Sequence, residues 1–175
     1  MKTILFLFFL FGNVFALQKQ TPKHDSENSV HLRFFLHDTI SGPNPTAIQV
    51  AQAATSKTFS TLFGDVMVID DPLTVGPDIN SKLVGRAQGL YSSSGKDAVG
   101  LLMAMSFVFS DDKYNGSSIV VLGRNDVFSA VREMPVVGGS GVFRLTSGYV
   151  QLKTYSFNTT SGDAVVEYNV FVAHK

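Results

Sequence analysis

From Ser29 onward, hydrophobic and polar residues alternate along the chain with the period of two that is typical of β-strands. In the first such run, one parity is apolar and ends in a carboxylate: Val30, Leu32, Phe34, Leu36 and Asp38. The other parity is mostly polar, with Phe35 as the exception: His31, Arg33 and His37. Successive side chains of a strand point to opposite faces, so this run predicts a half-buried strand with the Asp38 carboxyl on its apolar face.

Further runs rich in β-formers follow, separated by turn residues. The runs are Val66–Asp70, Leu83–Tyr91, Val99–Phe109, Ser118–Leu122, Val142–Thr154 and Ala164–Ala173. The predicted turns are Ser41–Pro45, Asp71-Pro72, Gly76-Pro77, Ser92–Gly95, Asp111–Gly116 and Asn158–Gly162. Many short strands joined by regular turns favour an all-β sandwich or a closed barrel, and we prefer the barrel.

The best candidate for a helix is Ala47–Lys57. Its Val, Thr and Gln content, and its position after two prolines, make an irregular or strand-like segment at least as good an interpretation. No other segment has a helical pattern.

One predicted strand carries unusually small side chains on a single face: Leu83, Gly85, Ala87, Gly89 and Tyr91. Small inward residues can leave a cavity inside a barrel of about eight strands. Alternatively, Gly85 and Gly89 mark bends or bulges and leave no cavity. The sequence pattern alone supports both interpretations equally.

The first residues are typical of an export signal. Lys2 precedes an apolar run from Ile4 to Phe11, and the small-residue pattern around Ala16 suggests cleavage there. The apolar run is far shorter than the roughly 20 residues of a membrane-spanning helix. We therefore expect a signal peptide over residues 1–16, a flexible arm over 17–28 and one barrel domain over 29–175.

Composition narrows the possible partners. The 14 basic and 14 acidic residues balance, and only 16% of the residues are charged, so no basic surface suited to nucleic acid is expected. The chain has no cysteine, so neither disulfides nor thiol chemistry can contribute. In an exported protein the sequons at Asn115 and Asn158 become candidate glycosylation sites.

Several ordered motifs resemble the plant dirigent family, over Val30 to the C-terminus. They are His37-Asp38, Gly42-Pro43, Val68–Thr74, Gly85–Tyr91, Val131–Met134, Val137–Arg144 and Gly162–Tyr168. The residues of the Val131–Arg144 block are most similar to those of the subgroup that includes the pterocarpan synthases. The resemblance implies an eight-stranded antiparallel up-and-down barrel of the lipocalin-like or allene oxide cyclase-like type, assembled as a homodimer or homotrimer and located in the apoplast.

Asp38 is the candidate catalytic residue. A carboxyl on an apolar face loses hydration, which raises its pKa and makes it available as a general acid. A strand-end Asp that caps a turn is the structural alternative, and the family match at His37-Asp38 favours a pocket position.

The resemblance also implies three substrate-binding residues. Tyr91 and Arg132 match pocket positions, although ordinary packing for Tyr91 and a surface ion pair with Glu133 for Arg132 stay open. Asn125 stands where lignan-forming members carry a second Asp; it can bind a phenol but cannot act as an acid. Asp126 should face the opposite way, and Asp70 and Asp71 are interpreted as turn residues before Pro72.

Other chemistries find little support in the sequence. The four histidines form no metal-ligand pattern, and the Gly138–Gly141 run lacks the Lys-Ser/Thr of a phosphate loop, so we interpret it as a tight turn. We expect no metal, no organic cofactor and no independent oxidase activity.

The family resemblance leaves three functions open. The first is stereoselective coupling of phenoxy radicals, for example from coniferyl alcohol, supplied by an external laccase or peroxidase. The second is dehydration and cyclisation of an isoflavanol, as in pterocarpan synthases, which is a lyase-type reaction. The third is a cell-wall barrel that binds phenolics without catalysis.

Overall fold

The computed structural model describes residues 29–173, and the predicted leader (1–16) and arm (17–28) lie outside the described residues. Nine strands follow one another: β1 (Ser29–Asp38), β2 (Ala47–Gln52), β3 (Asp65–Thr74), β4 (Leu83–Ser93), β5 (Leu101–Phe109), β6 (Ser118–Asn125), β7 (Arg132–Ser140), β8 (Ser147–Phe157) and β9 (Ala164–Ala173). Three single-turn 3-10 helices join them: η2 (Ser56–Thr58), η3 (Asp112–Tyr114) and η4 (Gly141–Phe143). No helix of the described part is long and apolar enough to cross a membrane.

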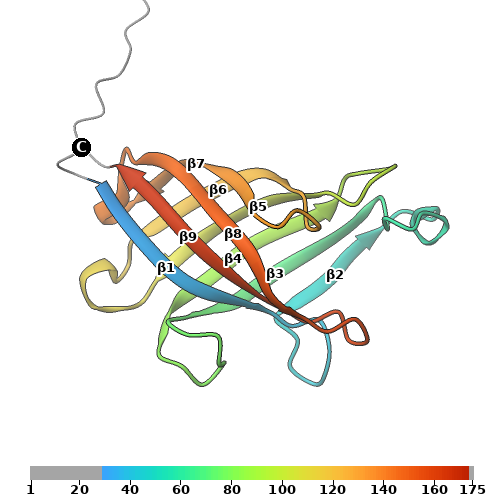
Figure 1. Ribbon diagram of the computed structural model, residues 1–175, viewed down its shortest axis with the longest axis horizontal. Helices are drawn as coiled ribbons and strands as arrows, with labels where there is room; N and C mark the ends of the chain where they lie inside the picture. Colours follow the sequence, from blue (N-terminus) through green and yellow to red (C-terminus); the bar gives the residue numbers. More distant parts are fainter. Residues whose placement is uncertain (1–28, 174–175) are drawn as a thin grey trace, which may run out of the picture.

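The strands close into a barrel (Figure 1). Strands β3 to β8 each pair antiparallel with the next strand along the chain, and β1 pairs with β9 from Ser29↔Ala173 to Asp38↔Ala164. The ring closes where β1 also pairs with β3, at Phe35↔Thr74 and Leu36↔Leu73. Strand β2 pairs with the earlier part of the same β3 edge. The ring therefore has eight positions, and the predicted eight-stranded antiparallel up-and-down barrel is confirmed.

Several predicted strand boundaries are wrong, and these errors lie next to proline or glycine residues. Asp71-Pro72 is not a turn but lies inside β3. Gly138–Ser140 forms the end of β7, a strand that the sequence did not indicate, and the predicted run Val142–Thr154 starts as a strand only at Ser147 because η4 precedes it. The ambiguous Ala47–Lys57 segment divides into β2 and the start of η2.

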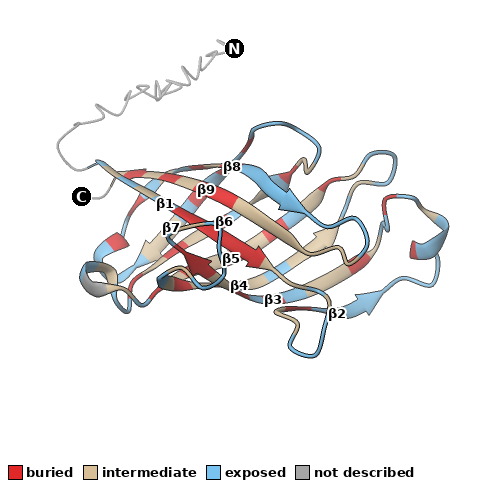
Figure 2. Cartoon of the chain, turned by 60° about the horizontal axis from the view of Figure 1, so that its bottom comes forward, coloured by how far each residue is buried: buried red, intermediate tan, exposed pale blue. Residues whose placement is uncertain are grey.

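Alternate residues of the strands fill the barrel (Figure 2). Phe34, Phe107 and Tyr168 meet at its centre, with ring centroids 5.0 to 5.9 Å apart. Phe109 and Phe143 extend this aromatic packing towards the β5–β6 loop, with centroids 5.6 Å apart. Burial of these rings dominates the core, because each aromatic side chain removes a large apolar area from water.

The small-residue face of β4 allows a close approach of β5. A Cβ added to Gly85 would lie 2.3 Å from the Val108 carbonyl oxygen, and one added to Gly89 would lie 2.2 Å from that of Ala104. In the β4–β5 register, Gly85 and Gly89 stand opposite Phe109 and Met105. The glycines thus make room for neighbouring backbone rather than for a ligand, which supports the second of the two interpretations of this face.

Candidate functional site

Asp38 ends β1 at the barrel mouth. Phe34 and Leu36, on the same parity, are buried in the core as predicted, but Phe35 and His37 of the other parity are buried too, so the half-buried alternation holds only over the first part of this strand. The Oδ1 atom of Asp38 is buried and has no hydrogen-bond partner within the described chain. Burial raises the pKa of Asp38 to about 6, opposed by the neighbouring Tyr91 hydroxyl and assisted by the negative charge of Asp163.

Asp71 lies beside Asp38, which the sequence did not indicate. The β1–β3 register passes through Leu36↔Leu73, and its continuation by two residues places Asp38 opposite Asp71. Asp71 is 1% exposed; its Oδ1 accepts a 2.6 Å hydrogen bond from the Thr46 hydroxyl, and its Oδ2 is buried without a partner. Burial, then the charge of Asp38, raises the pKa of Asp71 to about 8.

The third group at this end is Tyr91, on β4. It packs against the core, and its hydroxyl lies close enough to the Asp38 carboxyl to lower the pKa of that carboxyl. Burial and the charge of Asp38 raise the pKa of Tyr91, so its hydroxyl keeps its proton. The structure therefore brings together the predicted Asp38 and Tyr91.

Arg132 and Asn125 form a second polar group, across β6 and β7. Their register is fixed at Val121↔Val136, and its continuation places Asn125 opposite Arg132. Both side chains are buried; Arg132 donates to the Thr154 hydroxyl at 3.1 Å, while its Nε and Asn125 Oδ1 have no partner in the described chain. Burial lowers the pKa of Arg132, and the charges of Tyr168 and Asp126 oppose this shift.

The alternatives considered for neighbouring residues are resolved by the contacts. Glu133 accepts a hydrogen bond from Gln151 and makes no ion pair with Arg132. Asp126 pairs with Arg124 at 3.3 Å, as expected for a residue that faces away from Asn125. Arg132 is therefore an interior guanidinium and not part of a surface ion pair.

Tyr168 links the two polar groups electrostatically. The phenol of Tyr168, at the centre of the barrel, lies within electrostatic reach of Arg132, Asp71 and Asp38. Within residues 29–173, five buried side-chain polar atoms lack partners, and four of them belong to these two groups: Asp38 Oδ1, Asp71 Oδ2, Asn125 Oδ1 and Arg132 Nε. Buried polar atoms are rarely left unpaired, so this arrangement suits a ligand that carries its own hydroxyl or carbonyl oxygens.

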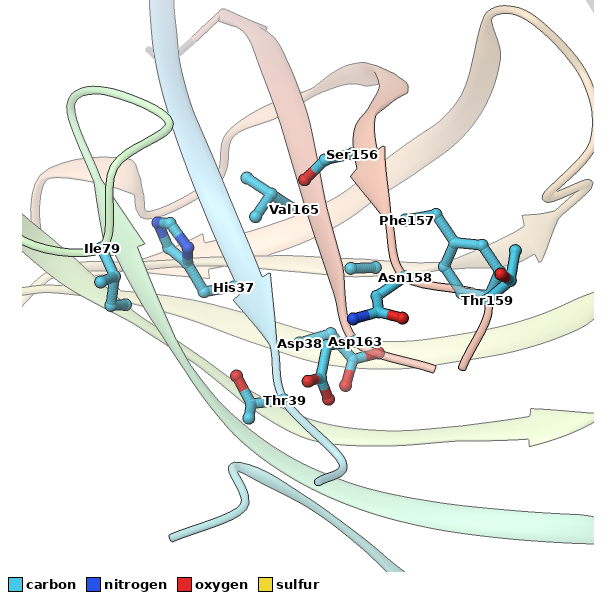
Figure 3. Close-up of a pocket in the computed structure, with 11 residues that line it drawn as sticks. His37, Asp38, Thr39, Ile79, Ser156, Phe157, Asn158, Thr159, Asp163 and Val165 are labelled. Atoms are coloured by element: carbon cyan, nitrogen blue, oxygen red, sulfur yellow. The ribbon is translucent and has the colours of Figure 1, made fainter. Parts of the chain in front are cut away.

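A groove of about 640 Å³ leads to Asp38 from outside (Figure 3). Ile79 and His37 line one side of it, Phe157 and Thr159 line the other, and the Asp38 carboxyl lies between them. Asp163 holds the groove in shape, because its carboxylate accepts hydrogen bonds from the Ile40 and Ser41 backbone and from the Ser41 hydroxyl. Asp38 and Asp163 are thus the two carboxyls that line the groove, and of these only Asp38 is desolvated.

Two further predicted features are placed by the structure. Asn115 and Asn158 both lie exposed in loops, Asn115 between β5 and β6 and Asn158 between β8 and β9. Over residues 29–173, no group of three or more His, Asp or Glu side chains is placed to hold a metal ion.

A family model that matches all of the described barrel shows which family the chain belongs to. The dirigent-like protein family matches residues 29–173. The chain belongs to the dirigent family. Dirigent protein 21 of Arabidopsis thaliana is 52% identical over 153 residues, which cover 87% of this chain and 81% of the relative.

Pterocarpan synthases are among the similar dirigent proteins. Pterocarpan synthase 1 of Glycine max is 50% identical over 149 residues, which cover 85% of this chain and 80% of the relative. The solved structure of a pterocarpan synthase dirigent protein superposes with a TM-score of 0.80 at 48% identity, covering 84% of this chain and 85% of that one. The dirigent barrel and its closed architecture are therefore shared with these relatives.

Proposed function

We propose that this dirigent protein binds a phenolic substrate at the barrel mouth and directs its ring closure with loss of water, as the names of its pterocarpan synthase relatives suggest. The observation that carries the proposal is the Asp38 carboxyl, which is desolvated, accessible from the groove and close to the Tyr91 hydroxyl. A carboxyl with a raised pKa retains a proton that it can donate to a departing hydroxyl.

The proposed reaction needs no oxidant. A benzylic hydroxyl of an isoflavanol-type substrate takes a proton and leaves as water, and a phenol hydroxyl conjugated to that carbon loses a proton. The resulting quinone methide is attacked by a second phenol of the same molecule, and proton transfer restores the first phenol. Asn125 Oδ1 and Arg132 Nε are suited to hold a phenol, because one accepts a hydrogen bond and the other donates one.

Stereoselective coupling of phenoxy radicals, for example from coniferyl alcohol, is the second candidate. The similarity to proteins named only as dirigent proteins favours it. In that case a laccase or peroxidase supplies the radicals, and the same interior sets the face on which they couple. Asn125 argues against it, because the lignan-forming members carry an acid at this position.

One assay distinguishes these functions from simple binding. The protein is incubated with isoflavanols without oxidant and, separately, with monolignols and a one-electron oxidant, and the products of both reactions are submitted to chiral analysis. We expect an enantiomerically enriched cyclised product without oxidant, and Asp38→Asn should lower its rate by about 10²–10⁴-fold while substrate binding persists. Binding without turnover of either class would leave a phenolic-binding barrel, and full activity of the variant would refute the role of Asp38.

We also propose export to the apoplast with glycans on Asn115 and Asn158. The leader pattern of residues 1–16 and the exposure of both asparagines support this. Mass spectrometry of protein extracted from the plant cell wall tests it, and an intact Met1 or unmodified asparagines at both sites would contradict it.

A further inference from the structure

Asp38 and Asp71 form a carboxyl pair on two facing strands. The β1–β3 register, continued two residues past its last pair Leu36↔Leu73, brings Asp38 and Asp71 to the same place, and both share the inward parity of these buried neighbours. The charge of Asp38 raises the pKa of Asp71, so the two carboxyl groups lie within electrostatic reach of each other. The two carboxyl groups are therefore close enough to repel each other when both are ionised.

Hydrogen bonding satisfies only part of this carboxyl pair. The Thr46 hydroxyl accepts from the Thr39 N–H at 3.1 Å, and its single hydrogen is available to Asp71 Oδ1 at 2.6 Å or to the His37 carbonyl at 3.3 Å. Asp38 Oδ1 and Asp71 Oδ2 have no donor within residues 29–173. A proton on one carboxyl would supply the donor that these buried oxygens lack.

The surroundings do not neutralise the pair. The charged and titratable groups that interact with it from neighbouring elements are Tyr91 and Arg86 of β4, Tyr168 of β9, Asp163 of the β8–β9 loop and Asp70 of β3, while Arg132 of β7 interacts with Tyr168. Arg86 is paired with Asp70 at 2.6 Å. Arg132 is held by Thr154 and the Val127 carbonyl. Within the described chain, neither guanidinium bonds to Asp38 or Asp71.

We propose that Asp38 and Asp71 share a single proton at neutral pH, and that Asp71 is the buried store from which Asp38 is reprotonated. Two carboxyl groups this close in a poorly solvated site do not both ionise, because the second charge would meet both the first charge and low polarity. The raised pKa of each group agrees with this arrangement. Asp38, which lines the groove, exchanges the proton with the substrate, and Asp71 is a positioning residue.

The catalytic consequence rests on the proposed function. The pair gives its proton to the benzylic hydroxyl, which leaves as water with the electron pair of the C–O bond. The proton lost from the conjugated phenol then returns the pair to its one-proton state. The substrate loses one water in total, and no oxidant or reductant takes part.

The direct test is a ¹³C NMR titration of protein labelled at the aspartate side-chain carboxyl carbons. We expect two coupled resonances, with one proton retained at about pH 7, where an ordinary aspartate is ionised. Asp38→Asn should lower the pKa of Asp71 by roughly one unit or more, because it removes the charge that raises it, whereas Asp71→Asn should leave the ionisation of Asp38 near its wild-type pH. Asp126→Asn is the control, because Asp126 pairs with Arg124 and is not among the groups that shift the pKa of Asp38 or Asp71, so it should leave both resonances unchanged.

The outcomes separate this inference from the proposed function. Independent titration of both carboxyls below about pH 5 in the wild type would overturn the shared proton, whatever the assay shows. Coupled titration without dehydrative turnover would keep the pair and refute the function. If Asp71→Asn fails to fold, the titrations of the wild type and of Asp38→Asn still test the shared proton. The Asp71 resonance must titrate at a different pH in Asp38→Asn than in the wild type if the two carboxyls are coupled.

Discussion

At the scale of single residues, strand parity located Asp38, whereas Pro72 concealed the same parity at Asp71. Asp38 continues an unbroken apolar parity, so its inward direction follows from the pleat alone. Asp71 continues the parity of Met67 and Ile69 equally well, but the Pro72 that follows it predicts a turn. Its contact with Asp38 depends on ring closure between β1 and β3, which no local pattern contains. Parity through the proline would have been the available signal.

The pH dependence of stability provides a test at this scale. The folded-state pKa of Asp71 is raised to about 8, so the folded protein holds a proton that the unfolded chain releases above about pH 4. The contribution of Asp71 to the free energy of unfolding is therefore highest below the unfolded pKa and falls as pH rises towards the folded pKa.

Asp71→Asn removes this titration. Relative to the wild type, we expect the variant to gain roughly 1 kcal/mol or more in the free energy of unfolding between about pH 4 and pH 8. Urea unfolding at a series of pH values measures the difference. A constant offset between the two proteins across this range would show that Asp71 carries no raised pKa.

At the scale of elements, strands with clean alternation were predictable, and so was β4 despite its glycines, whereas the proline of β3 and the proline and glycines of β7 concealed part or all of those strands. The predicted bounds Ala164–Ala173 are those of β9. Strand β3 accommodates Pro72 because its edge changes partner there: pairing with β2 ends at Ile69 and pairing with β1 starts at Leu73. No ladder hydrogen bond is needed from the missing N–H, which is the condition under which a strand tolerates proline.

The close approach of β4 and β5 makes a second prediction. A Cβ at Gly89 would lie 2.2 Å from the Ala104 carbonyl oxygen and 2.7 Å from Met105 Cα. Gly138 has a nearly equal φ, +156° against +154°, but no atom within 4 Å of such a Cβ. Gly89→Ala should therefore cost at least about 2 kcal/mol more in the free energy of unfolding than Gly138→Ala. Equal losses in thermal unfolding experiments would mean that only backbone strain matters at Gly89.

At the scale of the whole molecule, the barrel exposes an apolar row on the outside of five neighbouring strands. The strand registers align Ile48, Val68, Leu90, Ala104 and Leu122, and this set is called the apolar row. Ile48, Val68, Leu90 and Leu122 are all classed as exposed. A continuous exposed apolar surface on a sheet is typical of a protein interface. We propose that a second copy of the chain covers it, in the homodimer or homotrimer that the family resemblance implies.

The last prediction follows from the composition of the apolar row. It contains no charged residue, so a carboxylate placed at its centre would be desolvated without a partner when two copies associate. Leu90→Glu should raise the dissociation constant for self-association by about 10²-fold or more, as for a central interface residue that costs roughly 3 kcal/mol. Leu145→Glu is the matched control, because Leu145 is also exposed but precedes β8, outside the row. Analytical ultracentrifugation over a concentration series measures both variants. A wild-type protein that stays monomeric at high concentration, or equal dissociation of the two variants, would refute the assignment of the apolar row as the self-association surface.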